Sequence, residues 1–450
     1  MGSKSYKDII RRLDEGRNIL ITGSGGVGKT FSVEKLYEHI KNNTKKEAYI
    51  TAMTGAASLQ YTGATTIHRL TGIGIAKTKL DVREAMSKHW FIKNNLPILI
   101  SMDVIIIDEI SMMRSDTLEL VNYVFQEARD NFSEPFGGVQ VVFCGDMMQL
   151  PPVVKNDETL ERPWCFQSPI WEQLNIETVN LTKVYRQDDE EFIKNLNWIR
   201  TGICKDHVEE YFKNTVGHMF GDIKPIRLVA TNNEVNLINI TEINKVDSDP
   251  IVFKSIRVGD DRSLTKLSKD CPAEDSTVLK YGCQVVILKN GQDYVNGSMG
   301  TYVGECSIEL YDQLNKRFKA VKALKIELSD DKIVKVPVAV WELSKTEIKD
   351  VFDDETCTIK KERVKTVIAS ITQFPVKLGY AITTHRSQGM SLDYVQIDFL
   401  KFFADGQAYV ALSRARSYEG LRCLNFNKNV VRANGDAFNF YLDLKNKGEI

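Results

Sequence analysis

The chain has 450 residues, of which 43% are hydrophobic and 26% charged, and its formal net charge is −1. This composition is typical of a globular protein with a sizeable core, and the length predicts two to four domains. The near-zero charge excludes a whole-molecule basic field, so any nucleic-acid site must be a local groove.

Eight cysteines are scattered through the sequence with no C-x-x-C pair. The pattern argues against a zinc site or a disulfide framework and indicates buried thiols in a reducing compartment, with Cys144 as an example. The sequence has no apolar run of 18 residues and no visible signal peptide. We therefore expect an intracellular protein of a bacterial cytoplasm, nucleus, mitochondrion or virus-infected cell, without membrane contact.

The first predicted strand, near residues 18–22, runs into a glycine-rich turn. The string from Gly23 to Thr30, GSGGVGKT, matches G-x-x-x-x-G-K-[ST], the phosphate-binding loop of nucleotide triphosphatases. Lys29 would reach the β- and γ-phosphates, the Thr30 hydroxyl would hold Mg²⁺, and the following helix would add its positive N-terminal end. Glycines let the backbone N–H groups turn toward phosphate oxygens. The glycines of this loop are Gly23, Gly25, Gly26 and Gly28.

Alternating apolar strands and helices continue to about residue 185. The pattern indicates a mostly parallel α/β sheet. Residues 61–100 interrupt the alternation, and we predict that they form a small insertion. The predicted strands lie near 18–22, 48–52, 103–107, 139–144 and 177–181.

The apolar run 103–107 ends in two carboxylates, Asp108 and Glu109. Such a run is typical of a central strand of a parallel sheet, and the carboxyl end of such a strand is where ligands bind. Asp108 would hold Mg²⁺ through water, and Glu109 would orient and deprotonate the attacking water. A solvated turn is the alternative for this pair.

Three further side chains are candidates for contact with the phosphates. Gln149, in the string from Gly145 to Pro152 that follows an apolar strand, can sense a γ-phosphate through its amide. Arg186 and Arg414 can supply the positive charge that phosphoryl transfer needs in its transition state. The alternatives are a turn for Gln149 and a surface ion pair for each arginine.

A second α/β unit begins near Arg186, with a predicted helix over 189–201 and a strand over 226–230. From about 245 to 365 the pattern changes to short strands with Gly, Asn and Asp turns, which indicates a small β domain, and we expect a barrel. The α/β pattern returns after Val367.

Short strings of small, hydroxyl and imidazole side chains offer donors to a sugar-phosphate chain. Thr54 and the Gly55 amide follow the second strand, and His68 lies in the string TTIHR. Thr384 and His385 lie in the string TTHRSQG. A histidine that only caps a strand is the alternative for each imidazole. The aromatic candidates for stacking on bases are Trp90, Tyr294 and Phe374.

Taken in order, these motifs resemble those of the superfamily-one helicases, and within them the PIF family (petite integration frequency), which is related to the RecD-like group. The stretch from Asp116 to Gly138 is similar to this family's signature segment, which other superfamily-one helicases lack. The resemblance spans nearly the whole chain. The matching strings are GSGGVGKT, TAMTGAAS, TTIHRLTGIG, VIIIDEISMM, CGDMMQLPPV, LTKVYRQ, ITTHRSQGMSL and GQAYVALSRARSYEGLRCLNF.

The resemblance implies an α/β fold with two RecA-like P-loop domains, each built on a parallel sheet. The first domain would span 1–185 and carry a wedge insertion at about 61–100. The second would span 186–244 and 366–450, with a small β-barrel domain inserted over 245–365.

The resemblance also implies ATP-driven 5′ to 3′ translocation on single-stranded DNA with unwinding of duplexes, and ATP and Mg²⁺ as cofactors. The roles named above carry over residue by residue. Gln149 would contact the γ-phosphate, Arg186 and Arg414 would be arginine fingers, and Gly389 would lie close to the γ-phosphate. The strings that hold the hydroxyl and imidazole donors would face the DNA.

The implied partners are single-stranded DNA and forked or partial duplex DNA. We expect a monomer, with a DNA-induced dimer as the alternative. Family members usually carry a Gln upstream of the phosphate loop that reads adenine, and residues Tyr6 to Asn18 contain none. The resemblance therefore leaves adenine recognition without an assigned residue.

Two other functions stay open. A superfamily-one RNA helicase would share the G-D-x-x-Q-L-P-P string but not the segment 116–138. An ATPase switch that remodels a protein complex would hydrolyse ATP independently of nucleic acid. Stimulation of hydrolysis by DNA or RNA oligomers distinguishes the three functions.

Overall fold

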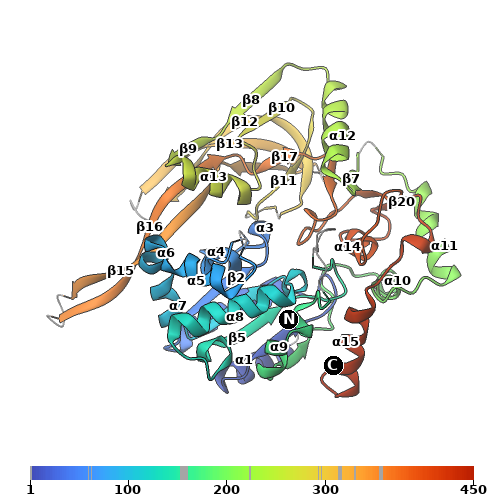
Figure 1. Ribbon diagram of the computed structural model, residues 1–450. Helices are drawn as coiled ribbons and strands as arrows, with labels where there is room; N and C mark the ends of the chain where they lie inside the picture. The colour runs from blue at the N-terminus through green and yellow to red at the C-terminus, as the bar shows by residue number, and fades with distance from the viewer. Residues whose placement is uncertain are drawn as a thin grey trace. The chain divides into compact units, whose positions relative to one another are not determined.

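The computed structural model describes residues 3–58, 60–61, 63–74, 76–152, 161–221, 224–291, 293–294, 296–312, 317–328, 331–353 and 358–450. The chain divides into two compact units, which are described separately (Figure 1). The first unit comprises Met1–Tyr185, Ser344–Ile368 and Asn434–Ile450, and the second comprises Arg186–Leu343 and Ala369–Ala433. None of the described helices is long and apolar enough to cross a bilayer.

A six-stranded sheet, in the order β3-β2-β4-β5-β1-β6, forms the centre of the first unit, and all its strand pairs are parallel. The middle strands are buried along their whole length, which explains their continuous apolar sequence. The five strands predicted for this region are confirmed. The strands are β1 (Ile19–Thr22), β2 (Ala48–Ala52), β3 (Thr65–Thr66), β4 (Val104–Asp108), β5 (Gln140–Cys144) and β6 (Glu177–Asn180).

The helices of the first unit include those of the predicted insertion at 61–100, which is largely helical. Near its start the insertion contains β3, which pairs with β2 at the edge of the sheet. The insertion is therefore continuous with the sheet. The helices are α1 (Ser3–Asp14), α2 (Lys29–Asn43), α3 (Gly55–Ser58), α4 (Ile67–Thr71), α5 (Lys79–Ser87), α6 (His89–Asn94), α7 (Leu96–Ser101), α8 (Ser115–Arg129), α9 (Pro169–Gln173) and α15 (Gly435–Asn446).

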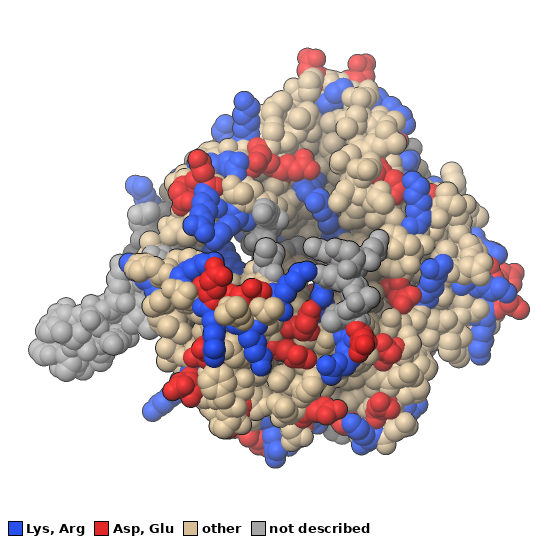
Figure 2. Space-filling view, in the orientation of Figure 1, with Lys and Arg blue, Asp and Glu red and all other residues tan. Residues whose placement is uncertain are grey.

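Charged side chains of both signs are interspersed over the face of the molecule drawn in Figure 2. This distribution agrees with the near-zero net charge of the sequence.

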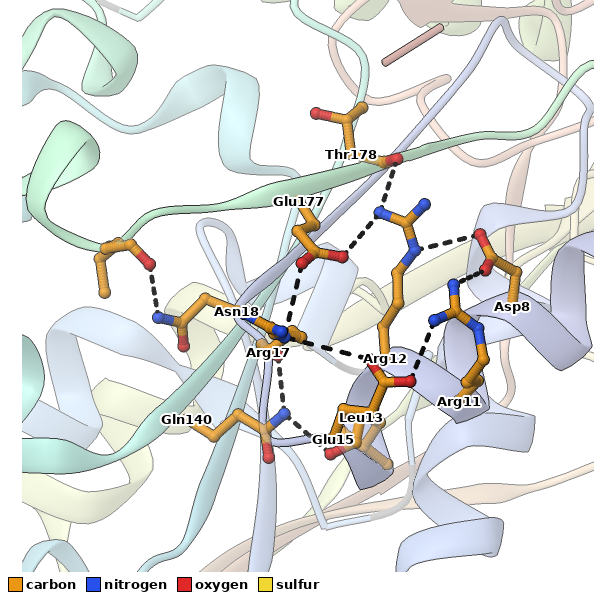
Figure 3. Close-up of polar contacts among 11 residues, drawn as sticks. Asp8, Arg11, Arg12, Leu13, Glu15, Arg17, Asn18, Gln140, Glu177 and Thr178 are labelled. Carbon is orange, nitrogen blue, oxygen red and sulfur yellow. Dashed lines mark hydrogen bonds and ion pairs between the residues drawn. The ribbon is translucent and has the colours of Figure 1, made fainter. Parts of the chain in front are cut away.

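A polar network attaches α1 to the amino ends of the strands (Figure 3). Arg12 forms an ion pair with Glu177, the first residue of β6, at 3.1 Å. The amide of Gln140, the first residue of β5, donates to the carbonyl oxygens of Leu13 at 3.0 Å and Arg17 at 2.7 Å. Because α1 covers the amino ends, the opposite edge of the sheet is left for ligands.

The guanidinium of Arg129 links the predicted signature segment to the end of the insertion. Arg129, at the end of α8, donates to the carbonyl oxygens of Ile100 at 2.6 Å and Met102 at 2.9 Å, next to the end of α7. The same side chain donates to the carbonyl oxygen of Gly137 at 2.8 Å. Gly137 lies in a left-handed turn that also includes Phe136, and Phe136 is fully buried.

The last helix of the chain, α15, belongs to the first unit, although the sequence analysis grouped it with the second RecA-like domain. Its N-cap residue, Asn434, accepts a hydrogen bond from the indole of Trp164 at 3.1 Å. Phe440 stacks on Phe166 with ring centroids 4.5 Å apart. These contacts bridge about 270 residues of sequence, a distance at which sequence patterns carry no signal.

The second unit contains a four-stranded parallel sheet in the order β18-β7-β19-β20, with a buried apolar core. The predicted helix over 189–201 and strand over 226–230 are confirmed. The elements around this sheet are α10 (Glu190–Arg200), α11 (Asp206–Asn214), β7 (Ile226–Val229), α12 (Asn232–Asn244), β18 (Ala381–Thr383), β19 (Val395–Asp398), α14 (Gln407–Leu412) and β20 (Leu421–Leu424).

A small β region lies between these elements in sequence, as predicted. Its largest sheet is antiparallel, in the order β14-β13-β12-β11-β17, and encloses a core that includes Tyr302 and Phe374. The strand β17 lies beyond the predicted end at 365. Closure of these strands into a barrel stays a prediction. The elements are β8 (Pro250–Lys254), β9 (Ile256–Gly259), α13 (Asp261–Asp270), β10 (Ser276–Lys280), β11 (Gln284–Ile287), β12 (Met299–Asp312), β13 (Arg317–Leu328), β14 (Ile333–Pro337), β15 (Ala339–Asp353), β16 (Thr358–Gln373) and β17 (Val376–Leu378).

We predict that Arg129→Ala destabilises the first unit by about 2–4 kcal/mol, because several backbone carbonyls lose a charged donor at once. Urea unfolding followed by tryptophan fluorescence measures the change. The matched control is Arg83→Ala, which removes an arginine that is 61% exposed and paired with Glu127 at 3.3 Å. The control should cost less than about 1 kcal/mol. Equal losses in the two variants would contradict the structural role of Arg129.

Candidate functional site

The predicted phosphate loop connects β1 to α2 at the carboxyl edge of the first sheet. Gly23 has φ +142°, and a Cβ at this position would collide with the carbonyl oxygen of Leu181. Gly28 is the N-cap of α2 and adopts the left-handed conformation with φ 82°. Only glycine meets both requirements without strain, so the motif glycines allow the tight turn from strand to helix.

The Lys29 side chain folds back over the loop that precedes it. Its ammonium donates to the carbonyl oxygens of Gly23 at 2.8 Å and Ser24 at 3.0 Å. The cation therefore lies against the loop whose amides are expected to bind phosphate. An ammonium in this position can exchange its carbonyl acceptors for the phosphate oxygens of a triphosphate, which accept hydrogen bonds more strongly.

The two predicted carboxylates lie at the carboxyl end of β4, which is separated only by β5 from β1, the strand that leads into the loop. Asp108 is 6% exposed, and its Oδ1 accepts a hydrogen bond from the amide of Glu109 at 2.8 Å. Glu109 is in the left-handed region, with φ 54° and ψ 43°. A non-glycine residue there costs about 1–2 kcal/mol, and such strain clusters at functional sites. The burial of Asp108 does not fit a solvated turn, which was the alternative for the pair.

A tyrosine that the sequence analysis missed completes this group. The Tyr61 hydroxyl donates to Oδ2 of Asp108 at 2.5 Å, and the side chain is 4% exposed. Burial, and then the charge of Asp108, raises the pKa of Tyr61, so the hydroxyl stays protonated and acts as the donor. The Thr30 side chain also hydrogen-bonds this hydroxyl. No motif marks Tyr61, because it lies 47 residues before its partner.

Gln149 is 7% exposed and lies in the loop that follows β5, beside the strand of the phosphate loop. The loop is held by Asp146, which is fully buried and accepts a hydrogen bond from the Tyr441 hydroxyl at 3.1 Å. Tyr441 also bonds the hydroxyl of Thr22, the last residue of β1, at 2.6 Å. The helix α15 thus links the ends of two strands that carry site residues, and the sequence analysis did not foresee this contact.

Two other side chains near the carboxylates are buried. The Cys144 thiol, at the end of β5, is fully buried as predicted, and burial raises its pKa. The Ser111 hydroxyl, two residues after Glu109, is buried and has no hydrogen-bond partner among the described residues. Buried polar groups are normally satisfied, so an unsatisfied hydroxyl here fits a site that takes a polar ligand.

The two predicted arginine fingers lie together in the second unit. Arg186 donates to the Ser391 hydroxyl at 2.8 Å and to the carbonyl oxygen of Ser413 at 3.0 Å. Arg414 is 2% exposed and donates to the Ser413 hydroxyl at 2.8 Å. Burial, and then the charge of Arg414, lowers the pKa of Arg186. Among the described residues, Arg186 makes no ion pair, so the alternative of a surface ion pair finds no support for it.

Gly389 is exposed and has φ 78°, in the loop that follows β18. The side-chain nitrogen of its neighbour Gln388 is buried, and no described residue accepts a hydrogen bond from it. Two guanidinium groups and an unsatisfied amide donor within one unit make a set of groups suited to an anion.

The predicted DNA-facing residues divide between the units. Thr54 and Gly55 lie at the start of α3, and His68 lies in α4 of the first unit. Burial lowers the pKa of His68, so this imidazole is neutral at pH 7. In the second unit His385 is exposed, whereas Thr384 is fully buried and its hydroxyl donates to the Val229 carbonyl at 3.5 Å. The prediction that Thr384 faces DNA therefore finds no support.

Of the aromatic candidates for base stacking, Phe374 is 5% exposed and packs in the core of the β region. Its ring is therefore unavailable to a base. Trp90 and Tyr294 are both half-buried, so burial does not exclude either of them. These two side chains stay candidates for stacking.

Comparison with known proteins identifies the family. A family model described as PIF1-like helicase matches residues 3–210. The ATP-dependent DNA helicase Pif1 of Bdellovibrio bacteriovorus is 32% identical to this chain, and the match covers 97% of the chain and 90% of that protein. The chain belongs to the PIF1-like helicase family. The resemblance stated from the motifs is thereby confirmed.

Two further relatives define how far the family likeness extends. The ATP-dependent DNA helicase PIF1 of Xenopus laevis is 32% identical over 96% of this chain, but the chain spans only 63% of that protein's length. The crystal structure of Bacteroides sp Pif1 in complex with ADP-AlF4 matches with a TM-score of 0.82 and 27% identity, over 100% of this chain and 98% of that one. The predicted α/β fold with two RecA-like domains is confirmed by this likeness and by the two parallel sheets.

We predict that Lys29→Ala abolishes ATP hydrolysis, because the loop loses the cation that faces the phosphates, while part of any DNA affinity survives. Release of inorganic phosphate from ATP measures the effect. The matched control is Lys35→Ala on the same helix, where the ammonium is paired with Glu38 at 2.6 Å on the surface. The control should hydrolyse ATP like the unmodified chain. Full hydrolysis by Lys29→Ala would refute the assignment of the loop.

Proposed function

We propose that this chain is an ATP-dependent DNA helicase that moves 5′ to 3′ along single-stranded DNA and unwinds duplexes. The observation that carries the proposal is the grouping of Lys29, Thr30, Asp108 and Glu109 at one edge of a parallel sheet in a PIF1-like chain. This grouping is the set of residues that phosphoryl transfer requires. We also propose that the protein acts inside the cell. The described cysteines are all free thiols, which is typical of a reducing compartment.

The residues of the first unit fit ATP and Mg²⁺. The phosphate loop and the Lys29 ammonium would hold the triphosphate. The Thr30 hydroxyl would bind Mg²⁺ and the Asp108 carboxylate would hold it through water, and both are the hard oxygen groups that suit this ion. When bound, Mg²⁺ neutralises phosphate charge. Glu109 would accept the proton of the attacking water, and its strained backbone would keep the carboxylate in one position. Gln149 would donate to the γ-phosphate.

Arg186 and Arg414 would act as fingers for the transition state, with Gly389 close to the γ-phosphate. The burial of Arg414 and the mutual repulsion of the two guanidinium groups support this role, because a bound anion would relieve the repulsion. The phosphate loop belongs to the first unit and both arginines to the second. Hydrolysis would therefore depend on domain movement, which is how such motors convert chemistry into translocation.

DNA is the proposed partner, as single strands and as forked or partial duplexes. The structure of a Bacteroides Pif1 bound to single-stranded DNA supports this proposal, as does a structure of two coordinating Pif1 helicases at forked duplex DNA. Thr54, Gly55, His68 and His385 are the proposed contacts. We propose a monomer, with a DNA-induced dimer as the alternative.

The direction of movement is tested on partial duplexes with a 5′ or a 3′ single-stranded tail. We expect strand displacement with ATP from the 5′-tailed duplex alone, because translocation from the 5′ end carries the enzyme into the duplex. Fluorescence of a released labelled strand is the measurement. Displacement only from the 3′-tailed duplex would contradict the proposal.

Coupling to nucleic acid is tested by ATP hydrolysis with added oligomers. We expect single-stranded DNA to stimulate hydrolysis more strongly than RNA of the same sequence. The stimulation should weaken as salt rises, because phosphate contacts carry the affinity. Hydrolysis that is indifferent to both oligomers would support an ATPase switch, and stronger stimulation by RNA would support an RNA helicase.

A further inference from the structure

Tyr61 connects two parts of the first unit: the segment that holds the proposed DNA contacts Gly55 and His68, and the proposed Mg²⁺ site at Asp108. It follows α3, whose first residue is Gly55, and it precedes β3 and α4, where His68 lies. Its backbone makes two hydrogen bonds within this segment: its amide donates to the Ser58 carbonyl at 3.2 Å, and its carbonyl accepts from the Ala64 amide at 3.4 Å. The side chain leaves the segment and enters the apolar core beneath the phosphate loop.

The hydroxyl of Tyr61 meets the carboxylate proposed to hold Mg²⁺. Oδ2 of Asp108 accepts from Tyr61 at 2.5 Å, and Oδ1 accepts from the Glu109 amide at 2.8 Å. Both oxygens are therefore held by donors, and the carboxylate has one orientation. The carbonyl of Asp108 also accepts from the Met53 amide at 3.2 Å, so the segment that begins at Met53 touches this residue twice.

We propose that Tyr61 is a positioning residue of the metal site, which orients the Asp108 carboxylate and makes Mg²⁺ affinity depend on the segment proposed to face DNA. Donors that hold a metal-binding group in place typically contribute 10- to 100-fold to metal affinity, although they never touch the metal. Because the hydroxyl is carried by the segment between Gly55 and His68, a shift of that segment would move the carboxylate. This inference rests on the proposed function of the nucleotide site.

Tyr61→Phe tests the proposal, because it removes the hydroxyl and keeps the ring in the core. The readout is the equilibrium binding of ADP, measured by isothermal titration calorimetry over a series of Mg²⁺ concentrations and in EDTA. We expect the Mg²⁺ concentration for half-maximal enhancement of ADP binding to rise by about tenfold, with ADP binding in EDTA unchanged.

The matched control is Tyr123→Phe in the same unit. Tyr123 is 6% exposed, and its hydroxyl interacts with Glu127 and Arg83 on the surface of α8 and α5 rather than with the carboxylates of the site. The control should show the Mg²⁺ dependence of the unmodified chain. Thermal unfolding of both variants checks that each is folded.

The outcomes separate this inference from the proposed function. An unchanged Mg²⁺ dependence in Tyr61→Phe overturns the inference, and so does an equal loss of ADP binding with and without Mg²⁺, which indicates a structural role only. If the unmodified chain itself binds ADP without any effect of Mg²⁺, the proposed nucleotide site is wrong, and the inference is lost with it.

A second measurement tests the link to DNA. We expect a saturating oligothymidylate to change the half-maximal Mg²⁺ concentration of the unmodified chain by about threefold or more, which is a typical coupling between sites. In Tyr61→Phe that change should disappear, because the segment no longer holds the carboxylate. An equal change in the two proteins would overturn the link.

Discussion

The parallel register of β1, β5 and β4 is the constraint on which the candidate nucleotide site depends. Ile21 pairs with Cys144 and Ile106 pairs with Val142, so the three strands end at nearly the same level. The backbone groups that follow them are therefore close in space, although they come from three separate stretches of sequence. The tight turn after β1 is allowed only because Gly23 has no side chain to meet the backbone beside β6.

Contacts on other sides of the sheet hold this edge rigid. The polar network of α1 fixes the amino ends of β5 and β6, and α15 reaches the carboxyl ends through Tyr441. A rigid scaffold of this kind can maintain local strain such as the left-handed backbone of Glu109. The fold thus stores a small unfavourable energy at the position where a catalytic base is proposed, and the surrounding packing offsets it.

The second unit holds two positively charged side chains, Arg186 and Arg414, near each other. Two guanidinium groups lie close to the same serine and are held by neutral oxygens, those of Ser391 and Ser413. The acceptors at these contacts are neutral, and the charge of Arg414 lowers the pKa of Arg186, so a bound anion would relieve the repulsion between the two groups.

The strands, the phosphate loop, the pair of carboxylates and the family likeness could be predicted from the amino-acid order, because these depend on local periodicity and on motifs whose residues are neighbours in the chain. The hydrogen bond from Tyr61 to Asp108, the contact of Tyr441 with the end of β1 and the burial of Thr384 became visible only in the three-dimensional structure. The first two contacts join residues that are 47 and more than 400 positions apart in the chain. The burial of Thr384 depends on which residues pack over the end of β18. Such pairings follow from the three-dimensional packing of elements, and a single sequence carries no local pattern that encodes them.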